Sequence, residues 1–448
     1  MELSDPHGAS GLTQSQLDAY WMPYTGNRQF KSDPRILVEA QGCHYRDAHG
    51  RQIFDGLSGL WTCGLGHGRV EIAEAVSHQL RTLDFSPPFQ FGHRLAFRLA
   101  EQIAARMPAG LNRVFFVGSG SEAADTSLKM ARAYWRIKGQ ASKTRFIGRA
   151  KGYHGVTFAG ISVGGMVGNR KMYGDGIDAD HLPHTLLPET AFSRGMPATG
   201  AQLADHLLDL IALHDASNIA AVIVEPFCGS AGVIVPPIGY LQRLREICDQ
   251  HQILLIFDEV ITGFGRSGAW TGAEAFGVTP DLLNFAKQVT NGAIPMGGVV
   301  ATDAFYQTFI NAGGPHYAIE FPHGHTYSAH PVACAAGLAA MDLLEREHAM
   351  DRVTELAPLL ETAVHALRGA PHVTDIRNYG LAAGLTLAPY PGEIARRPFE
   401  VAMACWRKGF YVRFGVDTLQ LAPPFISTPA QIDSLVNALG EALHEQAP

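Results

Sequence analysis

The stretch Ile256-Phe257-Asp258-Glu259-Val260 decides the fold of this chain, because it places two carboxylates directly after a strongly apolar run. The run from 253 to 257 predicts a buried β-strand that ends at Asp258. Further along, Lys287 is the only lysine between Lys171 and Lys408, and the chain has only eight lysines among its 35 basic residues. A lysine usually lies on the surface. An apolar run (282–286) leads into this one and a Gly/Pro loop (291–298) follows it, which favours a buried position.

A lone amine downstream of a buried carboxylate is the arrangement that pyridoxal phosphate chemistry requires. The lysine forms a Schiff base with the aldehyde of the cofactor, and the aspartate pairs with its pyridinium nitrogen. We therefore expect Lys287 to be catalytic and Asp258 to bind the cofactor. The alternative is that Lys287 is an ordinary surface lysine.

Length and composition indicate a globular protein of roughly two or three domains. The chain has 448 residues, of which 46% are hydrophobic and 17% charged, a composition outside the disordered range. A net charge of −7 and a pI near 6.3 predict no nucleic-acid partner. No apolar stretch approaches the length of a membrane span, so no membrane partner is expected.

The expected location is the cytoplasm. The polar segment 1–11 lacks the apolar core of a signal peptide. The six cysteines are scattered and form no CxxC pair, a spacing typical of reduced, mostly packed thiols.

Short β-rich runs alternate with amphipathic helices, which predicts an α/β fold with a mainly parallel sheet. The predicted strands cover residues 113–117, 144–148, 219–224 and 253–257, and the predicted helices cover 121–138 and 238–250. After Pro331, a helix over 332–345 and short runs at 373–376 and 381–387 predict a smaller antiparallel sheet. We expect a large domain at 62–330 and a smaller α+β domain formed by 1–61 and 331–448.

The segment Gly118-Ser119-Gly120-Ser121 follows a predicted strand and opens a predicted helix. Backbone N–H groups at a helix N-terminus attract phosphate, and small residues permit its close approach. The same letters fit G-x-G-x-x-A, so an NADP-dependent oxidoreductase is an alternative. That class needs a ribose-binding residue at the end of the next strand, where Arg149 could serve a 2′-phosphate. This alternative leaves Asp258 and Lys287 unexplained.

Two further sequence patterns suggest other classes of site. Residues 160–164 match the G-x-S-x-G elbow of serine hydrolases around Ser162. The elbow needs a following helix, whereas residues 165–168 predict a flexible loop. The chain has 20 histidines, including His323, His325 and His330, but no HExxH or Cys/His spacing typical of zinc, so no metal is expected.

With Lys287, the run from Ile256 to Arg266 resembles the signature of class III pyridoxal-phosphate aminotransferases. The resemblance extends from about Trp21 to Gln420. Residues 55–64 and 411–415 are most similar to ω-amino acid (β-alanine):pyruvate aminotransferases. The resemblance implies fold type I, a homodimer or dimer of dimers with active sites at the subunit interface, and pyridoxal 5′-phosphate as cofactor.

The resemblance also implies roles for individual residues. Gly120 and Ser121 match the phosphate cup, Tyr153 the aromatic that stacks on the pyridine ring, and Thr326 the residue that reaches the cofactor phosphate of the other subunit. Trp61, Arg413 and Gln420 match substrate-binding positions. Without the family, Trp61 could equally be a core residue and Arg413 a strand-edge charge.

The implied reaction is a ping-pong amino transfer by a Schiff-base mechanism, from an ω-amino acid or amine donor to a keto acid such as pyruvate. Arg413 would hold the carboxylate in a bidentate pair. A terminal amine displaces the donor carboxylate relative to an α-amino acid, so Arg413 is expected to move, with Glu225 as its resting partner; a loop-capping charge is the alternative for Glu225. Diamine and 4-aminobutyrate aminotransferases and aminomutases remain alternatives within the class.

The chain departs from the family pattern at two positions. Gly118 stands where the family usually has Asn or Asp, which is expected to loosen the turn or alter a hydrogen bond to the cofactor. His325 stands where the family usually has Phe or Tyr, which puts interface packing or substrate access in doubt.

Overall fold

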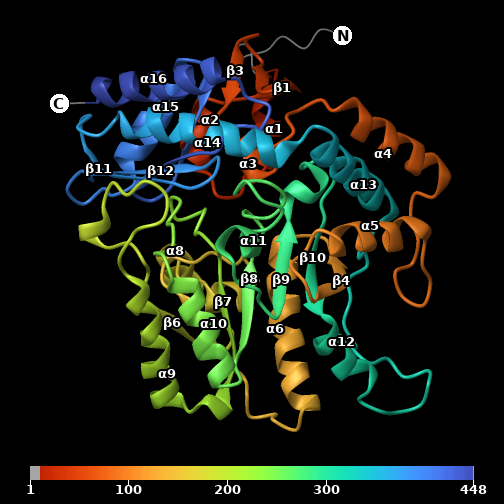
Figure 1. Ribbon diagram of the computed structural model, residues 1–448. Helices are drawn as coiled ribbons and strands as arrows, with labels where there is room; N and C mark the ends of the chain where they lie inside the picture. Colours follow the sequence, from red (N-terminus) through yellow and green to blue (C-terminus); the bar gives the residue numbers. More distant parts are fainter. Residues whose placement is uncertain (1–10, 447–448) are drawn as a thin grey trace.

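A seven-stranded sheet forms the centre of the computed structural model, which describes residues 11–446 (Figure 1). Its strand order is β4-β10-β9-β8-β7-β5-β6. β10 runs antiparallel to both neighbours, and the other adjacent pairs are parallel. The predicted mainly parallel sheet is therefore confirmed. The strands are β4 (Leu111–Val117), β5 (Arg145–Arg149), β6 (Ala179–Leu182), β7 (Ile219–Val224), β8 (Leu254–Asp258), β9 (Leu282–Ala286) and β10 (Gly297–Thr302).

Every residue of β7, β8 and β9 is buried. Strands covered on both faces read as continuous apolar runs, which is why these strands are visible in the sequence. Among the helices that cover the sheet, α6 (Gly120–Ile137) packs against β9 and β10, and α10 (Tyr240–Gln250) packs against β8. The strand ends are thereby held at fixed positions.

Two smaller sheets lie at the top of Figure 1. One has the order β1-β2-β3-β13, and β13 from the C-terminal part pairs in parallel with β3 from the N-terminal part. The other has the order β11-β12-β15-β14 and is antiparallel throughout. The division into domains at 62 and 331 stays a prediction. The strands are β1 (Leu37–Gln41), β2 (His44–Asp47), β3 (Gln52–Asp55), β11 (Val373–Asn378), β12 (Ala383–Leu387), β13 (Phe410–Tyr411), β14 (Arg413–Phe414) and β15 (Thr418–Leu421).

The remaining α-helices cover the sheets and connect them. They are α1 (Gln14–Ala19), α2 (Asn27–Ser32), α3 (Ser58–Trp61), α4 (Val70–Thr82), α5 (Arg94–Ala104), α7 (Phe158–Val163), α8 (Val167–Tyr173), α9 (His206–His214), α11 (Gly272–Phe276), α12 (Asp303–Ile310), α13 (Pro331–Arg346), α14 (Ala349–His365), α15 (Arg396–Arg407) and α16 (Pro429–Glu445). Within residues 11–446, no helix is both long and apolar enough to cross a bilayer.

The predicted loop at 165–168 is wrong in its second half, because α8 begins at Val167. The backbone N–H groups of Asn169 and Arg170 donate to Met166 O at 3.1 and 3.2 Å, which closes a helical turn in spite of Gly168.

Candidate active site

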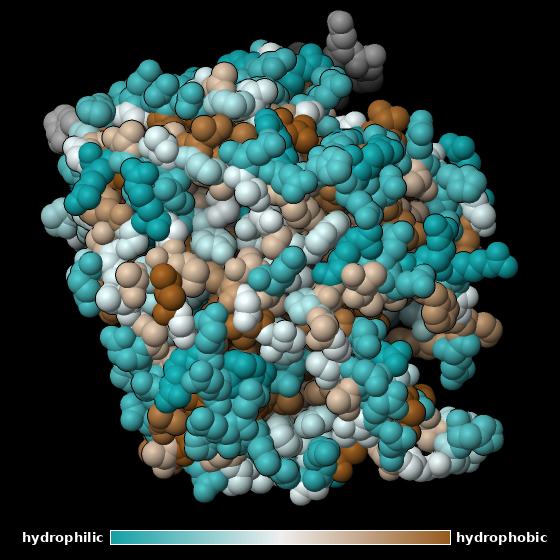
Figure 2. All heavy atoms as spheres, viewed as in Figure 1, coloured by the Kyte–Doolittle hydropathy of each residue, from teal (hydrophilic) through white to brown (hydrophobic). Residues whose placement is uncertain are grey.

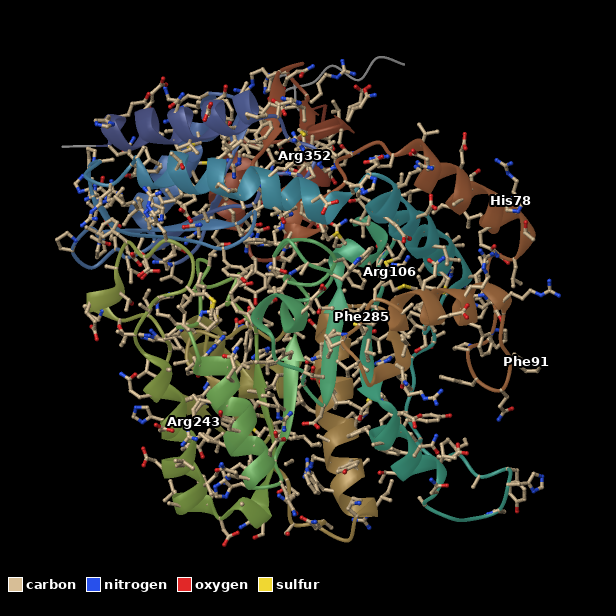
Figure 3. The ribbon with its side chains drawn as sticks, viewed as in Figure 1. His78, Phe91, Arg106, Arg243, Phe285 and Arg352 are labelled. Atoms are coloured by element: carbon tan, nitrogen blue, oxygen red, sulfur yellow. The ribbon has the colours of Figure 1, made fainter. Side chains whose placement is uncertain are left out.

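The predicted cofactor residues gather at the carboxyl end of the parallel strands. Asp258 is the last residue of β8, Lys287 directly follows β9, and Glu225 directly follows β7. Carboxyl ends of parallel strands meet at one edge of a sheet, where ligands of α/β proteins usually bind. Phe285, labelled in Figure 3, lies on β9 two residues before Lys287 and is fully buried. This edge of the sheet therefore lies inside the molecule.

The Lys287 amine is poised to lose its proton near neutral pH. Burial lowers its pKa to about 8, although the carboxylates of Asp258 and Glu225 act to raise it. The backbone of Lys287 has a φ of 53°, a left-handed conformation that costs a non-glycine residue roughly 1–3 kcal/mol. Such strain is typical of functional sites.

Asp258 is held in one orientation beside the lysine. The residue is 5% exposed. Its Oδ2 lies 2.8 Å from His154 Nδ1, and its Oδ1 accepts a hydrogen bond from the Val260 N–H at 3.2 Å. His154 is itself buried, so it fixes the carboxylate from behind. The sequence reasoning assigned no role to His154; the signal was its place directly after Tyr153.

The glycine–serine turn lies at the N-terminus of α6, next to the same edge. Ser119 caps the helix by accepting from Glu122 N. A Cβ on Gly120 would lie 2.9 Å from the Val260 side chain, so only glycine permits this close approach. The Gly118 N–H donates to Glu122 Oε2 at 2.6 Å. This bond ties down the turn at Gly118, the first departure from the family pattern.

Tyr153 is partly buried and lies beside Glu225 at the same strand ends. Burial and the neighbouring Tyr24 hydroxyl raise the pKa of Tyr153 to about 12, so the phenol stays protonated. Its backbone N–H donates to Glu225 Oε1 at 3.0 Å. The Tyr24 hydroxyl also donates to Asn169 Oδ1 at 3.2 Å. Sequence reasoning missed Tyr24, for which no motif gives a signal.

The candidate substrate residues Arg413 and Gln420 face each other across β14 and β15. Gln420 is fully buried; its Nε2 donates to Ser230 O at 2.9 Å, while its Oε1 has no partner. Arg413 is partly exposed and acts to lower the pKa of Lys287, which places its charge on the same side of the site. The pairing of Glu225 with Arg413 remains a prediction, because Glu225 Oε1 accepts the Tyr153 N–H in this conformation.

Trp61 and Thr326 lie in different surroundings from the residues above. Trp61 is only 4% exposed, and the Arg266 guanidinium lies 5.9 Å from the centroid of its ring. The side chain therefore packs in the core cluster of the single chain, and its substrate-binding role stays a prediction. Thr326 is exposed, and the neighbouring His325 ring lies 5.0 Å from the His323 ring.

The features that suggested other classes of protein have structural explanations. Arg149 is 1% exposed and donates to Glu225 O at 2.7 Å, so it is not available to a 2′-phosphate. Ser162 is fully buried, donates to Phe158 O and accepts from Gly176 N, so it is no nucleophile. No group of three or more metal-ligating side chains occurs in the described range 11–446.

Comparison with known proteins agrees with this geometry. Residues 26–443 match the family described as aminotransferase class-III. The chain is 63% identical to a beta-alanine–pyruvate aminotransferase of Pseudomonas aeruginosa, covering 96% of this chain and 97% of the relative. It is 62% identical to an omega-amino acid–pyruvate aminotransferase of Pseudomonas putida, covering 98% of both chains.

Solved structures show the same fold. An (S)-enantioselective omega-transaminase from Thermomicrobium roseum superposes with a TM-score of 0.90 at 32% identity, covering 96% of this chain and 97% of that one. An amine transaminase from an uncultivated Pseudomonas species, solved with pyridoxal phosphate bound, superposes with a TM-score of 0.87 at 35% identity, covering 96% and 99%. The chain is thus a member of the class III aminotransferases, enzymes of fold type I that depend on pyridoxal 5′-phosphate.

Proposed function

We propose that this enzyme transfers an amino group from an ω-amino acid or related amine, such as β-alanine, to pyruvate in a ping-pong reaction. The substrates named for the two relatives above support this choice. The structural observation that carries it is the Lys287 amine beside the buried Asp258 carboxylate, at the ends of adjacent strands. The donor and the keto acid are the small-molecule partners.

In this proposal Lys287 is the catalytic base and acid. Bound pyridoxal phosphate supplies an electron sink for the bond that breaks at the donor carbon. While neutral, Lys287 Nζ would accept the proton from the donor carbon. It would then deliver that proton to the cofactor. A pKa near 8 suits both directions, because an efficient proton shuttle has a pKa close to the working pH.

Two further side chains and one turn would hold the cofactor. Asp258, oriented by His154, stabilises the protonated ring nitrogen by opposite charge. The N-terminus of α6 at Gly120 and Ser121 presents N–H groups and a positive helix end to the phosphate. Tyr153 supplies an aromatic face for the ring.

Arg413 and Gln420 would bind the substrate. Arg413 supplies a guanidinium for the donor carboxylate, and the unpartnered Gln420 Oε1 offers an acceptor beside it. Glu225 would receive Arg413 when the donor carries no carboxylate. Trp61, being buried, would contribute at most an edge to the site.

The active assembly in this proposal is a homodimer, or a dimer of dimers, in which Thr326 reaches the partner's cofactor phosphate. Support comes from exposed apolar side chains near the loop that carries Thr326. Phe85 of the 83–93 loop packs 6.4 Å from Tyr327, and His93 Nε2 lies 2.7 Å from Ala329 O, so the two loops lie together. Exposed apolar residues on and near them are Phe85, Phe89, Phe91, Phe97, Tyr317, Ile319 and Tyr327, which we call the apolar rim.

The apolar rim contrasts with most of the face seen in Figure 2, where hydrophilic side chains predominate. Exposed aromatic groups that contact one another, as Phe85 and Tyr327 do, mark interaction sites. The cytoplasm is the proposed location, and five of the six cysteines are buried free thiols, as expected in a reducing compartment.

A donor panel tests the proposed function. β-Alanine, a diamine, 4-aminobutyrate and a simple amine are each assayed with pyruvate and with 2-oxoglutarate. We expect the highest kcat/KM for β-alanine with pyruvate. A preference for 4-aminobutyrate with 2-oxoglutarate, or rearrangement of one substrate without an acceptor, would replace the proposal with one of the other class III activities.

A further inference from the structure

We propose that Gln288 and Asn291 are positioning residues for Lys287: their side-chain amides fasten the segment that follows the lysine onto residues 64–66. We call these two side chains the amide clamp. Both are buried, with exposed fractions of 3% and 6%. The inference rests on the role of Lys287 in the proposed function.

Lys287 stands at a bend where its backbone needs support. The preceding strand, β9, pairs with β10 as far as Ala286, which fixes the chain up to the lysine. Lys287 then adopts a φ of 53°, in the left-handed region that residues with a Cβ seldom occupy. Such a conformation persists only where the surrounding structure over-determines it. The segment after Lys287 therefore needs an anchor of its own.

The amide clamp supplies that anchor. Gln288 Oε1 accepts a hydrogen bond from the Gly64 N–H at 2.7 Å. Asn291 Oδ1 accepts from the Leu65 N–H at 3.0 Å, and its Nδ2 donates to Gly66 O at 2.8 Å. The two amides also bind each other, because Gln288 Nε2 donates to Asn291 Oδ1 at 3.2 Å. Separation of the two segments would leave buried donors and acceptors unpaired, which is costly.

The clamp acts on Lys287 through a short piece of main chain. Residues Lys287–Thr290 form one 3₁₀ turn, and the N–H of Asn291 donates to the carbonyls of Gln288 and Lys287. The Gly292 N–H also donates to Lys287 O, at 3.3 Å. The lysine carbonyl is thus tied to the residue that the clamp holds. The position of the clamp therefore fixes the direction in which the lysine side chain leaves the backbone.

Close packing accompanies these hydrogen bonds. A Cβ on Gly64 would lie 2.6 Å from Gln288 Oε1, and a Cβ on Gly292 would lie 2.8 Å from Thr62 Oγ1. Glycine at both positions lets the two segments approach each other. Residues 64–66 directly follow the turn that carries Trp61, so the clamp also sets the position of Lys287 relative to this candidate substrate residue.

Loss of the clamp should act on the chemical step rather than on substrate binding. A misplacement of a reacting group by about 1 Å can lower a rate about 100-fold. The proposed substrate-binding residues Arg413 and Gln420 lie on β14 and β15, outside the two clamped segments. The expected effect is therefore a lower kcat with little change in KM.

Two single variants and the double variant of the holoenzyme test the clamp. Gln288→Met removes both polar atoms of that side chain at nearly constant size. Asn291→Gly removes the other amide and keeps the left-handed backbone, with its φ of 52°. Each should lower kcat for β-alanine with pyruvate about 10- to 100-fold. The double variant should be little worse than the poorer single variant, because the two amides act as one unit.

Gln79→Met is the matched control, because it removes another buried glutamine amide. Gln79 lies on α4, is 8% exposed, and donates from Nε2 to Leu83 O at 2.8 Å. This variant should lose stability and keep the wild-type kcat. Thermal unfolding of every variant is measured first, and the kinetics are then measured below the unfolding range. Loss of folded protein is thereby separated from loss of kcat.

Two readouts besides activity accompany the kinetics. Hydrogen–deuterium exchange should become faster in peptides that cover 62–67 and 287–293, because the Gly64 and Leu65 N–H groups lose their acceptors. Visible circular dichroism of the bound cofactor should weaken, because this signal depends on a fixed position in asymmetric surroundings. Gln79→Met should change neither readout.

A wild-type kcat in Asn291→Gly would overturn the inference, even if Gln288→Met fails to fold. A raised KM with an unchanged kcat would also overturn it, and so would additive losses in the double variant, since the amides would then act separately. A wild-type enzyme that does not transaminate β-alanine with pyruvate would instead overturn the proposed function, while exchange and circular dichroism would still test the clamp.

Discussion

The floor of the active site and the apolar rim of the subunit are built in different ways. The floor consists of strand ends, where Asp258 and Glu225 are buried and each is held by a hydrogen bond from a neighbouring loop. The apolar rim lies mostly on loops, where Phe91 and Tyr327 are exposed, and Tyr327 is the neighbour of the exposed Thr326. Phe91, labelled in Figure 3, lies on the loop between α4 and α5 at the edge of the molecule.

The difference indicates that the floor and the rim have separate functions. One chain is enough to position the groups proposed for proton transfer, because parallel strands and their buried neighbours fix them. The rim lacks such support, and its exposed apolar groups are the ones proposed to contact a partner subunit. Chemistry should therefore depend on the floor, and assembly on the rim.

The largest effect is expected at the floor, from Lys287→Ala. Loss of the proposed base should lower kcat/KM by about 10⁴-fold, the upper range for a general acid–base group. Lys171→Ala, at an exposed lysine, is the control and should behave as the wild type. Steady-state assays with β-alanine and pyruvate measure both, and a Lys287→Ala variant of normal activity contradicts the account.

Asp258→Asn should be the next most damaging change, with a loss of about 10²- to 10³-fold in kcat/KM. The amide keeps the shape of the side chain but removes the charge that stabilises the protonated ring nitrogen. Asp249→Asn changes an exposed carboxylate that pairs with Arg245 and should be nearly neutral. Equal activity of the two variants would show that the buried charge is not used.

Arg413→Ala tests whether Arg413, which lies partly exposed beside the floor, binds the donor carboxylate. A charge-assisted hydrogen bond is worth about 1.5–3 kcal/mol, so the KM for β-alanine should rise about 10- to 100-fold. The KM for benzylamine should change little, because that donor has no carboxylate. Equal damage to both donors would refute the assigned role.

The pH dependence of proton transfer should follow Lys287. A neutral amine is the base, and its pKa is lowered to about 8, so the rate should rise about tenfold between about pH 7 and pH 9 and then level off. An unperturbed lysine would give a rate that still rises at pH 10. Stopped-flow absorbance during a single half-reaction measures this profile.

The smallest effect is expected at the rim, where Phe91→Asp should weaken self-association about tenfold without unfolding the chain. The side chain is 71% exposed in a single chain, so its loss costs little within the subunit. Sedimentation velocity over a dilution series measures the effect. Leu213→Asp, at a similarly exposed leucine of α9, is the control. An unchanged dimer would place the interface elsewhere, and a monomeric wild type would contradict the proposed assembly.

The floor was largely predictable from sequence and the rim was not. Strands β8 and β9 are mainly apolar runs, so the positions of Asp258 and Lys287 at their ends could be predicted directly. The contacts of His154 with Asp258 and of Arg149 with Glu225 join residues from separate strands and follow no local pattern. Burial of Trp61 likewise depends on its packing against Arg266 from a distant segment.

The most direct test of the central claim is the site of cofactor attachment. The yellow holoenzyme is reduced with borohydride, digested and analysed by mass spectrometry. The account predicts that the colour is lost and that the reduced cofactor is found on Lys287 alone. Attachment to any other of the eight lysines, or a colourless protein without a label, would contradict it.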